Sequence, residues 1–148
     1  MNRGDYKEEG CCAVEIQKLM RLTHLLEKNA FKMKGVTTSQ AYTISELYLN
    51  NELTMTELSD RLALDSSTLS RNIQKLIDKG LVKKRVSEED KRVILISLTC
   101  EGKIKALEIR VIFKNNFGKV ICNIPEKDFE DIFKGVTLLL DALSKKVK

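Results

Sequence analysis

Residues 54–98 read TMTELSDRLALDSSTLSRNIQKLIDKGLVKKRVSEEDKRVILISL, and this stretch decides the fold. Thr54 and Glu57 have the spacing of a capping box, in which a hydroxyl and a carboxylate satisfy each other's exposed backbone amides where a helix begins. The short helix that follows has its apolar residues at helical spacing, namely Met55, Leu58 and Leu62.

A turn at Ala63–Ser66 restarts the chain, and Asp65 is a favourable N-cap for a second helix. Gly80 supplies a left-handed stop at the end of that helix. Its apolar stripe consists of Leu69, Ile73, Leu76 and Ile77. Two short helices joined by a turn of roughly three or four residues form a helix-turn-helix.

Strand-like residues follow without a break. Leu81–Val86 and Arg92–Leu98 are predicted strands, and Ser87–Lys91 is a polar turn between them. A β-hairpin directly behind a helix-turn-helix is the wing of a winged helix.

The segments on both sides of this unit are helical. The pattern predicts a long amphipathic helix from Ala13 to about Met33, ended by Gly35, and a second helix capped by Thr37 or Thr38. Thr99 begins a helix that runs to about Asn123, and Pro125 begins the last one.

The helices at the two chain ends carry more apolar surface than a small winged domain can cover. We expect them to pack against a second copy of the chain, and a compact monomeric helical subdomain is the alternative. The predicted fold is therefore mainly α with a small β-hairpin wing. Residues 1–34 form a tail and a dimerisation helix, residues 36–98 the winged helix-turn-helix, and residues 99–148 further dimerisation helices, within one structural domain.

Composition favours a soluble globular protein over a membrane or secreted protein. The 148 residues are 43% hydrophobic and 32% charged. No segment approaches the ~20 apolar residues of a membrane span, and the charged N-terminus lacks the apolar centre of a signal peptide. We therefore expect a cytoplasmic protein whose four cysteines are reduced thiols.

Positive charge is concentrated in the predicted helix-turn-helix and hairpin. The net charge is +5, and residues 66–92 hold eight basic against four acidic side chains. A solvated face is the plain interpretation of scattered charge. Concentration in one segment favours a polyanion partner.

The second helix presents a surface suited to reading DNA. Its outward positions are Ser66, Ser67, Thr68, Ser70, Arg71, Gln74 and Lys75. Small hydroxyl residues let the helix end approach base edges in the major groove, and Arg71 can donate two hydrogen bonds to guanine. A routine serine-rich helix start is the alternative.

The hairpin supplies the cations for the DNA backbone or the minor groove, namely Lys83, Lys84, Arg85, Lys91 and Arg92. Asp90 cannot favour DNA directly. It either holds an arginine in position through a charge-assisted pair or stabilises the turn.

Five short motifs in register resemble the MarR family of bacterial regulators. They are Thr54-x-x-Glu57-Leu58, Ser67-Thr68-Leu69-Ser70-Arg71, Leu76-x-x-x-Gly80-Leu81-Val82, Asp90-x-Arg92 and Leu98-Thr99-x-x-Gly102. The resemblance implies a triangular homodimer that binds a roughly palindromic operator in double-stranded DNA. It also implies that Ser67, Thr68, Ser70 and Arg71 face bases or phosphates, that Asp90 and Arg92 shape the wing, and that a ligand or an oxidant alters the spacing of the two reading helices.

Adjacent thiols at Cys11 and Cys12 are the main candidates for a sensor, with Cys122 as a further member. Thiolates are ligands for soft metals and arsenicals and react with oxidants. In the alternative, Cys100 and Cys122 are core residues and the pair sits on a mobile tail. No cofactor is required. Tyr42 and Tyr48 either line a pocket for an aromatic effector or pack in the core.

Other function classes fit less well. The chain has no phosphate-binding loop, no nucleotide-binding glycine pattern and no histidine-based triad. A cysteine nucleophile would need a base, and His24 is the only imidazole available. An enzyme is therefore not expected. A protein-interaction winged helix predicts an apolar or acidic reading surface, whereas this one is hydroxyl-rich and basic. A repressor is favoured over an activator, because occupancy alone blocks a promoter.

Overall fold

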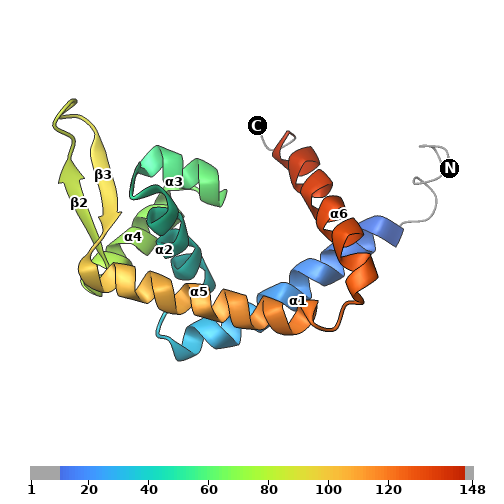
Figure 1. The fold of residues 1–148 in the computed structure, drawn as a ribbon. Coiled ribbons are helices and arrows are strands. Elements are labelled where there is room, and N and C mark those ends of the chain that lie inside the picture. The colour runs from blue at the N-terminus through green and yellow to red at the C-terminus, as the bar shows by residue number, and fades with distance from the viewer. Residues whose placement is uncertain (1–10, 146–148) are drawn as a thin grey trace. The chain divides into compact units, whose positions relative to one another are not determined.

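The computed structural model describes residues 11–145, with the side chains of Cys11, Cys12 and Met33 left outside the description. The helices are α1 (Cys11–Met33), α2 (Thr38–Asn50), α3 (Met55–Leu62), α4 (Ser66–Asp78), α5 (Cys100–Ile121) and α6 (Glu126–Ser144). The strands are β1 (Glu52–Thr54), β2 (Val82–Val86) and β3 (Ile94–Leu98). Figure 1 shows the β2–β3 hairpin extending beyond the helices of the helix-turn-helix.

The sheet has one strand that the sequence did not reveal. Its order is β1-β3-β2 with both neighbours antiparallel, so β3 lies in the middle. The predicted hairpin is confirmed, although its loop runs from Ser87 to Val93. β1 has only three residues, too few for an alternating pattern, and its pairing with β3 is long-range.

Glycines end two helices as predicted. Gly35 and Gly80 both have positive φ, 75° and 70°. Behind α1 the amide of Val36 donates to the Phe31 carbonyl, and behind α4 the amide of Leu81 donates to the Leu76 carbonyl. These bonds satisfy carbonyls that the helix ends leave open.

Side chains cap the starts of the helices. Thr37, not Thr38, caps α2 in a capping box with Gln40. The predicted box at Thr54 and Glu57 and the Asp65 cap of α4 are confirmed.

One apolar core holds α2, α3, α4 and the sheet together. Its fully buried members include Phe31, Ile44, Leu47, Leu58, Leu69, Ile73, Leu76, Ile96 and Ile109. The helix-turn-helix therefore shares one core with α2 and the sheet.

Gly102 marks a close approach between α5 and the start of β2. A Cβ atom added there would lie 1.9 Å from the Leu81 carbonyl oxygen. Thr99 tightens the junction, since its hydroxyl donates to the Gly80 carbonyl (2.6 Å) and accepts from the Gly102 amide (3.0 Å). This contact explains why glycine follows Thr99 at this spacing.

The chain divides into two compact units, residues 1–113 and 114–148. The core lies in the first unit. In α6, which belongs to the second unit, no residue is buried, and Phe133 is 67% exposed. No helix within residues 11–145 is long and apolar enough to cross a membrane.

Candidate nucleic-acid interface

The turn between α3 and α4 is fixed by its own hydrogen bonds. Ala63 takes a left-handed conformation with φ of 50°, which is uncommon for a residue with a Cβ atom. The Ser59 hydroxyl donates to the Leu64 carbonyl and the Leu64 amide donates to the Ser59 carbonyl. The angle between the two helices is thus set locally.

Helix α4 has a buried face and an exposed face, as expected for a reading helix. Leu69, Ile73 and Leu76 are buried, and Ile77 is half-buried. The predicted reading residues Ser66, Ser67, Ser70, Arg71, Gln74 and Lys75 are all exposed, while Thr68 is half-buried.

A buried polar contact that the sequence did not reveal ties α4 to α2. Asn72, only 8% exposed, donates through its side-chain amide to the Thr43 hydroxyl (2.9 Å) and the Ser39 hydroxyl (3.1 Å). At the end of α4, the Lys79 ammonium donates to the Gly35 carbonyl (2.6 Å) and the Gln40 side chain (3.1 Å). Directional bonds of this kind fix the rotation of α4 about its axis, which apolar packing alone fixes less well.

Asp65 determines the hydrogen-bonding character of the α4 N-terminus. Its carboxylate accepts from the Ser67 hydroxyl (2.6 Å) and from the Thr68 amide (2.8 Å). These bonds, that of Ser67 first, hold the pKa of Asp65 well below its ordinary value. An ionised carboxylate only accepts, so the Ser67 proton is directed to Asp65. The Ser67 oxygen is left as an acceptor toward any molecule on the exposed side.

The side chains of Arg71 and Gln74 also use part of their hydrogen-bonding capacity within α4. The Arg71 Nε donates to the Ser67 carbonyl (3.3 Å), which leaves the two terminal amino groups free to donate. The Gln74 amide nitrogen donates to Asp78 (2.8 Å), which leaves its oxygen to accept. The exposed face of α4 therefore combines a donor at Arg71 with acceptors at Ser67 and Gln74.

The wing residues are exposed, and Asp90 is a turn residue. Lys83, Lys84, Arg85, Asp90, Lys91 and Arg92 all lie at the surface. The Asp90 carboxylate accepts from the backbone amide of Arg92 (2.9 Å), and the Asp90 carbonyl accepts from the Val93 amide (3.0 Å). Of the two roles considered for Asp90, the structure supports stabilisation of the turn.

Arg85 differs from the other wing cations. Its guanidinium donates to both carboxylate oxygens of Glu52, from Nε to Oε1 (2.8 Å) and from Nη2 to Oε2 (2.5 Å). Sequence reasoning missed Glu52, because it lies outside the hairpin and reaches Arg85 only through the pairing of β1 with β3.

Known proteins share this architecture. A MarR family model matches residues 34–93. The transcriptional regulator SarZ of Staphylococcus aureus is 32% identical over 111 residues, which cover 73% of this chain and 72% of SarZ. The chain belongs to the MarR family of winged helix-turn-helix transcription regulators.

Other similar proteins either match this chain over a smaller part of their length or share only its fold. The organic hydroperoxide resistance transcriptional regulator of Bacillus subtilis is 36% identical over 78 residues, 51% of this chain and 53% of that protein. The chain spans about half the length of the Bacillus relatives that it matches, 52–58%. Streptococcus pneumoniae FabT in complex with DNA has the same fold, with a TM-score of 0.81, 21% identity and coverage of 92% of this chain and 96% of FabT.

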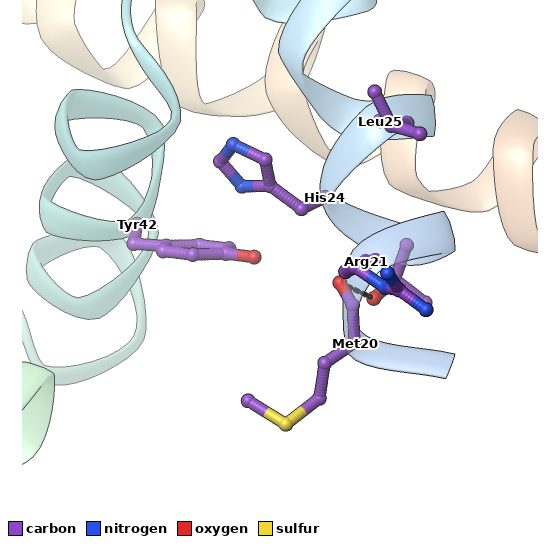
Figure 2. Close-up of a pocket in the computed structure, with 6 residues that line it drawn as sticks. Met20, Arg21, His24, Leu25 and Tyr42 are labelled. Carbon is purple, nitrogen blue, oxygen red and sulfur yellow. Dashed lines mark hydrogen bonds between the residues drawn. The ribbon is translucent and has the colours of Figure 1, made fainter. Parts of the chain in front are cut away.

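In this MarR-family chain a pocket of about 600 Å³ opens between α1 and α2. It is lined by Met20, Arg21, Thr23, His24, Leu25 and Tyr42. Figure 2 shows the side chains of Met20 and His24 on the side of α1 that faces the Tyr42 ring. Tyr48 lines a different pocket, of about 330 Å³, with the Arg110 guanidinium 5.3 Å from its ring centroid. The two tyrosines therefore do not share one site.

Tyr42 is also a structural residue. Its ring stacks on Phe113 at 6.1 Å, and its hydroxyl donates to Glu27, a buried carboxylate on α1. Burial, followed by this bond, raises the pKa of Tyr42 far above its ordinary value. Tyr42 thus links α1 to α2 at the rim of the larger pocket.

The cysteine hypotheses have different outcomes. Cys100 and Cys122 are exposed thiols in the chain, so the alternative that makes them core residues is wrong. The side chains of Cys11 and Cys12 lie outside the described residues, and their role as a sensor stays a prediction. Within the part of the chain that is described, no three His, Cys, Asp or Glu side chains are grouped as metal ligands.

Proposed function

We propose that this protein is a DNA-binding transcription regulator that recognises a two-fold symmetric operator as a homodimer. The observation that carries the proposal is the α4 surface. An exposed row of hydroxyl, Arg and Gln side chains is held by a buried apolar face and by Asn72, beside a basic hairpin. FabT, which has the same fold, was solved in complex with DNA.

The hydrogen bonds within α4 determine which donors and acceptors its side chains can offer to the bases. In the major groove, guanine offers the acceptors O6 and N7, whereas cytosine and adenine offer amino donors. Arg71, which keeps two free amino groups, fits guanine. Ser67, whose proton is directed to Asp65, fits an amino group of cytosine or adenine. We therefore expect each half-site to contain a guanine close to an amino-bearing base in the same groove.

The homodimer accounts for the apolar surface of α6. Its exposed apolar residues are Phe129, Ile132, Phe133, Val136, Leu138, Leu139, Leu140 and Leu143. A patch of this kind on one helix marks an interaction site, and a second copy of the chain is the partner that gives a two-fold symmetric reader.

Selection of bound DNA from a random duplex library, at a stated salt concentration, tests the proposal. We expect an inverted repeat with half-sites about one helical turn apart, roughly 10 base pairs from centre to centre. Ser67→Ala should relax the preference for cytosine or adenine at one position, while Thr56→Ala, which removes an exposed hydroxyl on α3 outside the predicted reading residues, serves as the matched control. Recovery of no preferred sequence, together with a monomer in sedimentation at micromolar concentration, would refute the proposal.

Control by an effector is the second part of the proposal, with repression as the expected sign. The pocket beside Tyr42 is large enough for a small aromatic compound, and Cys11 and Cys12 are the expected target of thiol reagents. A ligand shifts operator affinity only by the difference between its affinities for the two dimer conformations. Operator binding should be titrated with an arsenical and an oxidant for the wild type and for Cys11→Ser/Cys12→Ser. An unchanged response in the double variant contradicts the thiol mechanism.

A further inference from the structure

The pair between Glu52 and Arg85 connects the two edge strands of the sheet. Glu52 lies on β1 and Arg85 on β2, with β3 between them. In the ladder, Glu52 and Lys83 both stand opposite Ser97, and Arg85 stands opposite Leu95. Residues that face each other across a ladder share one side of the sheet. The Arg85 side chain therefore crosses β3 on that side and reaches Glu52 by two hydrogen bonds.

This pair joins the wing to the start of the helix-turn-helix. Glu52 is two residues before Thr54, which is both the last residue of β1 and the N-cap of α3. Because α3 is fixed to α4 by the turn at Ala63, a bond from β2 to β1 restrains the wing relative to the reading helix. An Arg–carboxylate pair with two parallel bonds also fixes orientation, which a single bond from a lysine would not.

The pair also takes Arg85 out of the cations offered to DNA. Glu52 offsets its charge, and the Nε–Nη2 edge of the guanidinium is occupied by the carboxylate, so that only the outer N–H groups remain for another acceptor. The bonds to Arg85 lower the pKa of Glu52, so the carboxylate stays ionised at neutral pH. Among the described residues, Lys84, Lys91 and Arg92 form no side-chain ion pair.

We propose that Glu52 and Arg85 are positioning residues that hold the wing at the angle needed for specific binding, and that Arg85 does not contact DNA phosphate. This inference rests on the proposed DNA-binding function. It replaces the expectation from sequence that Arg85 is one of the backbone contacts.

The salt dependence of DNA binding distinguishes a positioning role from a phosphate contact. Each phosphate neutralised by the protein contributes about −0.9 to the slope of log K against log salt concentration. Lys84→Ala, the matched control, should reduce the magnitude of the slope by about 0.9. Arg85→Ala should leave the slope unchanged and lower the affinity for the selected operator relative to random DNA.

Glu52→Gln and the charge-exchanged variant Glu52→Arg/Arg85→Glu complete the experiment. Glu52→Gln releases the Arg85 charge, so binding to random DNA should strengthen while the ratio of specific to random binding falls. The exchanged variant recreates the pair and should recover that ratio relative to Arg85→Glu alone. Thermal unfolding of each variant checks that the domain remains folded.

Two results would overturn the proposal. One is a slope change for Arg85→Ala equal to that for Lys84→Ala, which would show that Arg85 leaves Glu52 for a phosphate. The other is an exchanged variant no more specific than Arg85→Glu. If the wild type binds no DNA at all, the proposed function fails instead, and the two failures are distinguished by that one measurement.

Discussion

Apolar side chains are buried in the region that contains the helix-turn-helix, whereas on helix α6 they are exposed. In the first, residues such as Leu58, Ile73 and Ile96 are completely buried within one chain. In α6, Phe133, Leu138 and Leu140 are each more than 60% exposed, and none of its residues is buried. Both have amphipathic patterns, so the pattern alone does not tell which surface the chain itself covers.

The difference indicates that the region with its own core and helix α6 have different tasks. A region with its own core can hold reading residues in fixed positions, whereas a helix without one needs a partner to become stable. We infer that α6 is completed by the second copy and that the winged region is complete in each copy.

The largest effect is expected from a charge placed in the apolar surface of α6. Phe133→Asp should dissociate the dimer and lower operator affinity toward the level of random DNA, a loss on the order of 10³-fold or more. Lys134→Asp, next to it on the polar side, places the same acidic side chain there with a larger change in net charge and should leave the dimer intact. Sedimentation and operator titration measure both effects. A dimeric Phe133→Asp protein would show that α6 is not part of the interface.

A smaller effect on stability is expected at the α5–β2 junction in the winged region. Gly102→Ala places a methyl group against the Leu81 carbonyl oxygen, which backbone movement must relieve. We expect a loss of about 1–3 kcal/mol in the free energy of unfolding. Gly118→Ala is the control, because an added Cβ atom there meets nothing within 4 Å among the described residues beyond its own helix backbone. Denaturant unfolding with equal stability for Gly102→Ala and the wild type would contradict the described junction.

Within the winged region, substitution of a base-reading residue and substitution of a backbone-anchoring residue should affect DNA binding differently. Arg71→Ala should relax discrimination at one or two base pairs, at a cost of about 1–3 kcal/mol if Arg71 bonds a guanine through both amino groups. Arg92→Ala should instead weaken binding to every sequence. Competition between the operator and its single-base variants measures the difference. Equal weakening of all sequences by Arg71→Ala would remove Arg71 from base readout.

The smallest effect concerns the N-cap of α4 and depends on pH. Because the folded state lowers the pKa of Asp65, its ionised form stabilises the fold above the ordinary pKa of about 4, and this contribution is lost as the pH falls below it. Asp65→Ala should therefore lower the melting temperature most at neutral pH, and less in acid. Asp65→Asn, which keeps a capping oxygen without an ionisable group, is the control and should lose less stability at neutral pH. A pH-independent difference for Asp65→Ala would contradict the assigned bonds.

Local signals predicted the helix-turn-helix and the hairpin because short-range chemistry determines them. The caps at Thr54 and Asp65 and the stop at Gly80 each use atoms within a few residues. The same holds for the exposed face of α4, since the positions of Leu69 and Ile73 determine what lies opposite.

The missed features depend on residues far apart in the sequence. β1 pairs with a strand more than 40 positions later, and Glu52 meets Arg85 only because of that pairing. Asn72 is assigned no role from the sequence, because its partners Ser39 and Thr43 are about 30 positions away. The need for glycine at position 102 depends on the Leu81 carbonyl beside it, which the motif alone does not indicate.

Operator spacing tests the central claim of a two-fold symmetric reader most directly. Affinity should be measured for the selected operator, for one with five extra base pairs between the half-sites, and for one with a single half-site destroyed. Five base pairs are about half a helical turn and turn one half-site to the opposite face of the duplex. We predict that the insertion weakens binding as much as loss of the half-site does. Affinity unaffected by the insertion would contradict simultaneous reading by two fixed α4 helices.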